Sequence, residues 1–162
     1  AAFRKGAFDA AAIAVGYEHR RFRRQVYATL KGQGVPIATF LHPSSYVEKS
    51  ALLQEGSIVL VNCTIDMHAR VGENVLLSSR CFVSHHVKIG SHTFCGPAVN
   101  LAGYAEIGEC CFLGINTTCI DGVTVGMNVQ TAAGSVVTKD MPDHTLIAGV
   151  PAVVKKTLSF DE

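Results

Sequence analysis

One aliphatic residue recurs every six positions through the middle of this chain. Cutting the sequence from Leu41 gives 16 hexads that keep their register through the one beginning at Thr131. The first residue is Leu, Ile or Val in 13 of the 16 hexads, and the fifth is Ser, Ala, Cys, Thr or Val in all 16. A period of six fits neither a helix nor simple strand alternation. It is typical of a parallel β-helix, whose flat sides each take one inward aliphatic residue and whose corners take small ones.

Three hexads close one triangular coil of 18 residues, and stacked coils lie about 4.8 Å apart. Residues 18 apart in the sequence are therefore predicted to be neighbours in space. The fold class predicted is mainly β, with a parallel β-helix over residues 41–141. The repeat breaks after Asp140, so we expect residues 142–162 to form an irregular tail that caps the last coil.

The segment before the repeat reads as a short β-α-β piece. Residues 8–15 are predicted to be a buried strand that stops at Gly16, and residues 18–31 an amphipathic helix with apolar residues four apart. A second short strand is predicted over residues 35–40. We therefore expect residues 1–40 to form a unit distinct from the coils.

Composition excludes several classes of protein. Only 17% of the residues are charged and the net charge is +1, which argues against a disordered chain and against partners such as nucleic acid or anionic membrane. The longest apolar run, Ala10 to Val15, is too short to span a membrane. Six cysteines without a C-x-x-C pair are expected to be reduced and mostly buried, as in a cytoplasmic protein. The chain begins with Ala rather than Met, so we expect that residues precede it in the natural protein.

Five segments make the chain resemble a known family. They are Leu41-His-Pro-Ser-Ser, Val83-Ser-His-His-Val-Lys-Ile-Gly, Cys111-Phe-Leu-Gly-Ile-Asn, Gly134-Ser-Val-Val-Thr-Lys-Asp-Met-Pro and Ala148-Gly-Val-Pro-Ala. With the hexads, they resemble the left-handed β-helix acyltransferases of the hexapeptide family. The branch that they match contains sialic acid O-acetyltransferases and nucleotide-amino-sugar N-acetyltransferases. The resemblance implies left-handed coils and acetyl-CoA as co-substrate. It also implies that residues 1–40 are the remnant of a Rossmann-like sugar-nucleotide-binding domain whose glycine-rich turn is absent.

His85 and Gly103 are the candidate reaction centre. By resemblance, His85 matches the catalytic histidine that acts as general base, and the amide of Gly103 matches the donor that holds the thioester carbonyl. The period adds independent support, because the two residues are 18 apart and Gly103 should lie directly above His85. A base beside an amide donor is the arrangement that acyl transfer requires.

Several neighbouring positions depart from the family pattern. His86 replaces the usual Asp or Glu that orients the catalytic imidazole, and we keep it as a second catalytic candidate. Ser78, Ser84 and Phe94 replace the usual Asn, Glu and His, and are candidate acceptor-binding residues. For Phe94 a purely structural ladder beneath Phe112 remains open. A role for His92 also remains open. His68, His86 and Tyr104 share one column, but two histidines without a third ligand do not predict a metal site.

The resemblance also implies where acetyl-CoA binds. Pantetheine should run along a groove between neighbouring subunits of a homotrimer, parallel to the coil axis. The residues expected to contact the cofactor are Ile115, Ala133, Gly149, Val150, Pro151 and Lys155. Lys155 can equally be a solvated lysine of the tail.

The resulting prediction is an acetyl-CoA-dependent acetyltransferase that acts on a 4-amino-4,6-dideoxy sugar nucleotide of surface-glycan synthesis. Two alternatives stay open at this point. One is O-acetylation of a sialic acid or another small hydroxyl compound, and the other is a non-catalytic β-helix scaffold. The sequence alone names neither the sugar nor the nucleotide.

Overall fold

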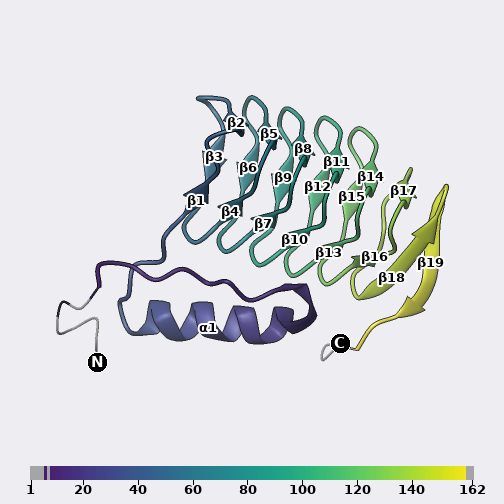
Figure 1. Ribbon diagram of the computed structural model, residues 1–162. Coiled ribbons are helices and arrows are strands. Elements are labelled where there is room, and N and C mark those ends of the chain that lie inside the picture. The colour runs from purple at the N-terminus through teal and green to yellow at the C-terminus, as the bar shows by residue number, and fades with distance from the viewer. Residues whose placement is uncertain (1–5, 7, 160–162) are drawn as a thin grey trace.

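The chain forms a stack of triangular coils with one helix alongside it and a hairpin at its end (Figure 1). The structure is a computed structural model that describes residue 6 and residues 8–159. Strands β1 to β17 each span two residues, and each contains the aliphatic first position of a hexad or its equivalent. Paired strands are parallel and 18 residues apart up to β17, as Phe40 with Ile58 and Leu41 with Val59 illustrate. The predicted mainly β fold and coil length are confirmed.

The strands line up into three sheets, which are the three sides of the triangle. Sheet 1 contains β1 (Phe40–Leu41), β4 (Ile58–Val59), β7 (Leu76–Leu77), β10 (Phe94–Cys95), β13 (Phe112–Leu113), β16 (Gln130–Thr131), β18 (Thr145–Gly149) and β19 (Ala152–Thr157). Sheet 2 contains β2 (Tyr46–Val47), β5 (Thr64–Ile65), β8 (Phe82–Val83), β11 (Asn100–Leu101), β14 (Thr118–Cys119) and β17 (Val136–Val137). Sheet 3 contains β3 (Leu52–Leu53), β6 (Arg70–Val71), β9 (Lys88–Ile89), β12 (Glu106–Ile107) and β15 (Thr124–Val125).

Each corner between two sheets is a short turn that repeats from coil to coil. The fourth residue of most hexads adopts the left-handed region there, for example φ +59° at His86 and +60° at Tyr104. We name the corners by the sheets they join. Corner 1–2 includes residues 78–80, 96–98, 114–116 and 132–134; corner 2–3 includes 66–68, 84–86, 102–104 and 120–122; corner 3–1 includes 72–74, 90–92, 108–110 and 126–128.

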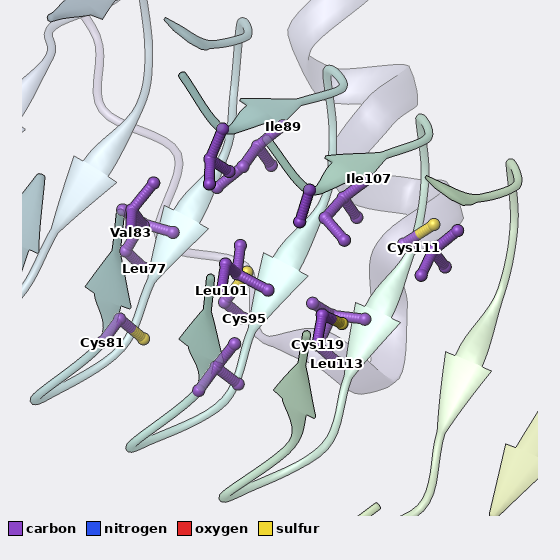
Figure 2. Packing of buried hydrophobic residues seen from close by; sticks show 14 of the residues in the cluster. Leu77, Cys81, Val83, Ile89, Cys95, Leu101, Ile107, Cys111, Leu113 and Cys119 are labelled. Atoms are coloured by element: carbon purple, nitrogen blue, oxygen red, sulfur yellow. The ribbon is translucent and has the colours of Figure 1, made fainter. Parts of the chain in front are cut away.

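The interior of the coils is the hydrophobic core. First-position residues such as Leu77 and Leu101 are fully buried, with the small fifth-position residues beside them (Figure 2). Five of the six cysteines are buried in this interior and Cys110 is half-buried, and all six are free thiols. Burial raises the pKa of the Cys111 and Cys119 thiols to about 12, so these groups are protonated packing residues rather than nucleophiles.

The predicted helix packs along sheet 1 and corner 3–1. A 3₁₀ turn over Tyr17–His19 leads into α1, which spans Arg20–Gly32. Tyr17 stacks on Phe112 with ring centroids 5.0 Å apart, while Lys31 at the other end pairs with Glu55. The helix therefore runs antiparallel to the rise of the coils. A 13-residue helix is about 20 Å long, which matches roughly four coil spacings.

The two predicted N-terminal strands are wrong in extent. Residues 8–15 form no strand, and a single parallel bridge joins Ala11 to Ile37. Ile13 and Ile37 are buried against Tyr27 of the helix. Two short segments without a third strand seldom sustain a sheet, which explains why only one bridge forms. The prediction for residues 1–5 and 7 lies outside the described residues.

The tail was predicted to be irregular, but its described residues form a β-hairpin. Strand β18 pairs in parallel with β16 at a spacing of 16 residues, so the last coil is two residues shorter than the others. Strand β19 then pairs antiparallel with β18. Pro151 sits in the hairpin turn, where no ladder hydrogen bond is needed.

Candidate active site

His85 and Gly103 lie against one another at corner 2–3, as the 18-residue period predicts. A β-carbon built on Gly103 would lie 2.7 Å from Nε2 and 3.1 Å from Nδ1 of His85, and closer still to Cε1. The imidazole therefore lies over the space that a side chain at position 103 would fill. Only glycine at this position lets the ring take the place it occupies.

The amide of Gly103 is available to a ligand. Among the described residues, no acceptor pairs with this N–H, whereas the Gly103 carbonyl accepts a hydrogen bond of 2.9 Å from Gly122. At the equivalent position two coils earlier, the amide of Met67 donates to Oδ1 of Asp66 over 2.7 Å. Corner 2–3 thus presents an imidazole and an unoccupied amide donor side by side.

Aromatic rings, rather than a carboxylate, hold the His85 imidazole. His85 meets the rings of His86 and Tyr104 edge-on, with centroids 5.6 Å and 5.2 Å apart. Tyr104 also stacks on His86 at 4.7 Å and 19°. Within the part of the chain that the structure describes, neither ring nitrogen of His85 has a hydrogen-bond partner. Packing therefore sets the orientation of the ring.

His86 occupies the predicted column between two other rings. His68 lies one coil below with ring centroids 4.9 Å apart, and Tyr104 lies one coil above. Nδ1 of His86 is buried and has no hydrogen-bond partner among the described residues. Since the backbone there has φ +59°, which Asn and Asp adopt more readily than other residues, the corner itself can accommodate an acid.

Side chains of sheet 3 extend this site, and our sequence reasoning missed them. A hollow of about 700 Å³ is lined by His68, His86 and Tyr104 together with Arg70, Lys88 and Glu106. Lys88 and Glu106 form an ion pair of 2.6 Å. The signal in the sequence was the charged series at positions 70, 88 and 106, which are 18 apart and immediately precede aliphatic first positions.

The candidate acceptor residues are not gathered around His85. Ser84 precedes it at corner 2–3 and is buried, but Ser78 lies at corner 1–2. Phe94 points outward from sheet 1, where it packs against Phe112 and against Tyr17. These contacts give Phe94 a structural role in seating the N-terminal segment. His92 lies at corner 3–1, where its Nδ1 pairs with Nδ2 of Asn74 over 2.9 Å.

The candidate acetyl-CoA residues form a separate column. Ile115 and Ala133 are exposed at corner 1–2 in successive coils, and Gly134 donates to the carbonyl of Ile115 over 2.8 Å. The column continues to Gly149 at the end of β18 and to Val150 and Pro151 in the turn before β19, and Lys155 is exposed on β19. Corners 1–2 and 2–3 are the opposite edges of sheet 2. Within one chain, this column and His85 are therefore apart.

Residue 6 and residues 8–159 contain neither a metal-binding cluster nor a membrane-spanning helix. No cluster of three or more His, Cys, Asp or Glu side chains that could hold a metal ion occurs there. No helix there is long and apolar enough to cross a membrane.

Solved structures of acetyltransferases match this fold over most of the chain. PerB from Caulobacter crescentus, crystallised with CoA and GDP-perosamine, is 32% identical with a TM-score of 0.91, covering 95% of this chain and 73% of PerB. The acetyltransferase domain of PglB from Neisseria gonorrhoeae, crystallised with acetyl coenzyme A, is 27% identical with a TM-score of 0.87, covering 90% of this chain and 70% of that one.

Curated proteins match over shorter segments. Serine acetyltransferase 2 of Arabidopsis thaliana is 34% identical over 100 residues, which is 54% of this chain and 31% of that protein. A tetrahydropyridine-dicarboxylate N-acetyltransferase of Enterococcus faecalis is 48% identical over 46 residues, which is 28% of this chain and 20% of that protein. The chain thus spans about a third or less of the length of these curated relatives. No family model matches it.

Together, the coils and the 32% identity over 73% of PerB show the class: the chain belongs to the hexapeptide-repeat acetyltransferases, which fold as left-handed β-helices. Within that family, it is similar over nearly its whole length to a perosamine N-acetyltransferase.

Proposed function

We propose that this protein transfers the acetyl group of acetyl-CoA to the amine of a 4-amino-4,6-dideoxy sugar nucleotide. The observation that carries the proposal is the juxtaposition of His85 with the unoccupied amide of Gly103. The similarity to an enzyme crystallised with CoA and GDP-perosamine supports this donor and this class of acceptor.

In the proposed reaction, the acceptor amine attacks the thioester carbonyl carbon, and His85 takes the proton that the nitrogen loses. The C–N bond forms as the carbonyl π electrons move onto oxygen. The N–H of Gly103 donates a hydrogen bond to that oxygen and stabilises its negative charge. The intermediate then collapses, the C–S bond breaks, and CoA leaves as a thiolate that can take the proton from His85. No metal or redox cofactor takes part in these steps.

The separation of the two corners supports a shared site between subunits. We place acetyl-CoA along the column of Ile115, Ala133 and Gly149–Pro151, with Lys155 near its phosphates. The thioester would then face His85 of a neighbouring subunit across a homotrimer. Sheet 2 lies between both corners and carries exposed Tyr46 and Phe82, whereas sheet 1 is covered by α1 and sheet 3 is charged. We therefore place the subunit contact on sheet 2.

The proposed homotrimer can be tested separately, by the mass of the protein in solution. Sedimentation equilibrium at micromolar concentration should give three times the mass of the chain, and Phe82→Glu should shift it toward the monomer by burying a charge at the contact. The matched change Leu52→Glu, on exposed sheet 3, should leave the mass unchanged. A stable monomer for the unmodified protein would rule out the shared site.

The proposed location is the cytoplasm. The free buried thiols are compatible with a reducing compartment.

The assay that tests the proposed function follows the release of free thiol from acetyl-CoA. The purified chain is given GDP-, UDP- and dTDP-linked 4-amino-4,6-dideoxy sugars, sialic acid and serine in parallel. We expect thiol release only with an amino-sugar nucleotide. Release with sialic acid alone would instead support the O-acetyltransferase alternative, and release with none of the acceptors would support a non-catalytic scaffold.

His86 offers a prediction about the missing carboxylate. His86→Asp should keep or raise kcat, because the acid can orient and stabilise the His85 imidazolium and fits the left-handed backbone. His86→Asn is the matched control, since it has the same shape without the charge, and it should be slower than His86→Asp. His86→Ala should cost less than the loss of His85. Equal kcat for the Asp and Asn variants would contradict the orienting role, and a greater loss in His86→Ala than in His85→Ala would reverse the two assignments.

A further inference from the structure

A small pocket lies between the first turns of α1 and corner 3–1, away from the corner that holds His85. Its volume is about 160 Å³. Three arginines of the helix line one side, and the coils supply histidine and asparagine on the other. The residues used here are Arg20, Arg21, Arg24, His92, Asn128 and His144.

Positive charge dominates the pocket. Among the described residues, Glu109 is the one acidic side chain that lines the pocket, beside the guanidinium groups of Arg20 and Arg24. Arg24 makes a weak contact with the Cys110 thiol, 3.7 Å from Nη1 to Sγ, and Arg20 lies over the ring of Phe112 at 5.3 Å. Neither contact neutralises a guanidinium.

A fourth arginine on the same side of the helix strengthens this imbalance. Arg23 is three residues after Arg20, so the two share a helix face. Its side chain is 2% exposed, and its three guanidinium nitrogens have no hydrogen-bond partner among the described residues. A buried cation without a counter-charge is costly. Burial lowers the pKa of Arg23 to about 10, and burial together with the charge of Arg24 lowers the pKa of His92.

The position of the arginines at the start of α1 also favours a bound anion. Four of the first five residues of α1 are arginines, and its first turn has no acidic residue. The positive end of the helix dipole disfavours cations there and favours an anion. Asn128 lines the pocket as a neutral side chain whose Nδ2 lies 3.2 Å from Nδ1 of His144 and donates to the carbonyl of Ser159 over 3.5 Å.

We propose that this pocket binds a phosphate-type oxyanion through the guanidinium groups of Arg20 and Arg24, with Arg23 adding positive charge from the same helix. Guanidinium groups match phosphate oxygens in geometry as well as in charge. The pocket is large enough for a phosphate or a diphosphate but not for a nucleoside as well. A nucleoside or sugar attached to the anion would therefore extend out of the pocket. The site is separate from the His85 centre of the same chain and does not depend on acetyl transfer.

Calorimetric titration with inorganic pyrophosphate tests the site directly, without an acetyl donor or acceptor. We expect saturable binding that weakens about tenfold or more in Arg20→Gln and in Arg24→Gln, because each change removes a charge-assisted hydrogen bond. Arg24→Lys should retain more affinity than Arg24→Gln, since it keeps the charge but loses the planar fork. Arg80→Gln, a change at the exposed corner 1–2, is the matched control and should bind like the unmodified protein.

Parallel titrations with phosphate, GDP, UDP and CoA identify the source of the anion. Tighter binding of a nucleoside diphosphate than of pyrophosphate, lost in the same variants, would assign the pocket to the acceptor. The same pattern with CoA would assign it to the donor, and equal affinities would indicate a free anion. Absence of binding by every probe at millimolar concentration would overturn the proposal, as would binding that Arg20→Gln and Arg24→Gln leave unchanged. Because no acetyl transfer is measured, these outcomes do not depend on the proposed enzymatic activity.

Discussion

Replacing His85 by alanine is expected to lower kcat about 10²- to 10⁴-fold, the usual contribution of a general base. The affinity for acetyl-CoA should change little, because the proposed donor contacts lie at corner 1–2, on the other edge of sheet 2. Steady-state kinetics with the acceptor found by the thiol-release assay give kcat, and calorimetry with CoA gives the affinity. His42→Ala is the matched control, since His42 lies in the first coil, where its Nδ1 contacts Ser44.

Two results would contradict this assignment. Full activity of His85→Ala on a verified acceptor would place the base elsewhere, or show that the amine arrives already deprotonated. A loss of CoA affinity equal to the loss of kcat would show that His85 acts in donor binding instead.

Adding one methyl group at Gly103 is expected to lower kcat about 100-fold. The new β-carbon would occupy space now taken by the His85 ring, so the imidazole must move, and misplacement of a catalytic group by about 1 Å can cost that much. The measurement is kcat for Gly103→Ala against Gly16→Ala. Gly16 is a clean control, because a β-carbon there meets no atom within 4 Å and its φ is −73°.

A double variant separates the steric effect from other damage. Once His85 is alanine, no ring remains for the added methyl group to displace, so Gly103→Ala should cost far less in that background. Equal losses in both backgrounds would mean that the methyl group acts on the backbone amide or on acetyl-CoA and not through His85. Full activity of the single variant would refute the tight contact itself.

The six-residue repeat made both the coils and the pairing of His85 with Gly103 predictable, because the register of a solenoid is strict. Because each coil has 18 residues, positions 85 and 103 must be neighbours in adjacent coils, and the structure places the two residues in contact. The column of His68, His86 and Tyr104 follows from the same arithmetic. Each depends only on local spacing and on hydrogen bonds between adjacent coils.

Features outside the repeat were harder to predict. Pro142 and Pro151 suggested an irregular tail, but Pro142 precedes the hairpin and Pro151 lies in its turn. The hairpin is held by the pairing of β18 with β16, a contact that local sequence does not encode. Phe94 was a candidate for acceptor binding because it replaces a histidine that is usual in the family, and its column beneath Phe112 suggested a structural role instead. Its contact with Tyr17 of the N-terminal segment could not be predicted from the repeat. The arginine pocket likewise depends on how α1 docks against corner 3–1, and no periodicity predicts that docking.

The most direct test of the proposed N-acetyl transfer is carbon NMR of a reaction with acetyl-CoA labelled with ¹³C at the carbonyl. The acceptor is the 4-amino-4,6-dideoxy sugar nucleotide that gives the fastest thiol release. The label should appear in an amide carbonyl on the sugar, and His85→Ala should abolish the new signal on the same timescale. Label found in an ester, or only in free acetate, would contradict the account.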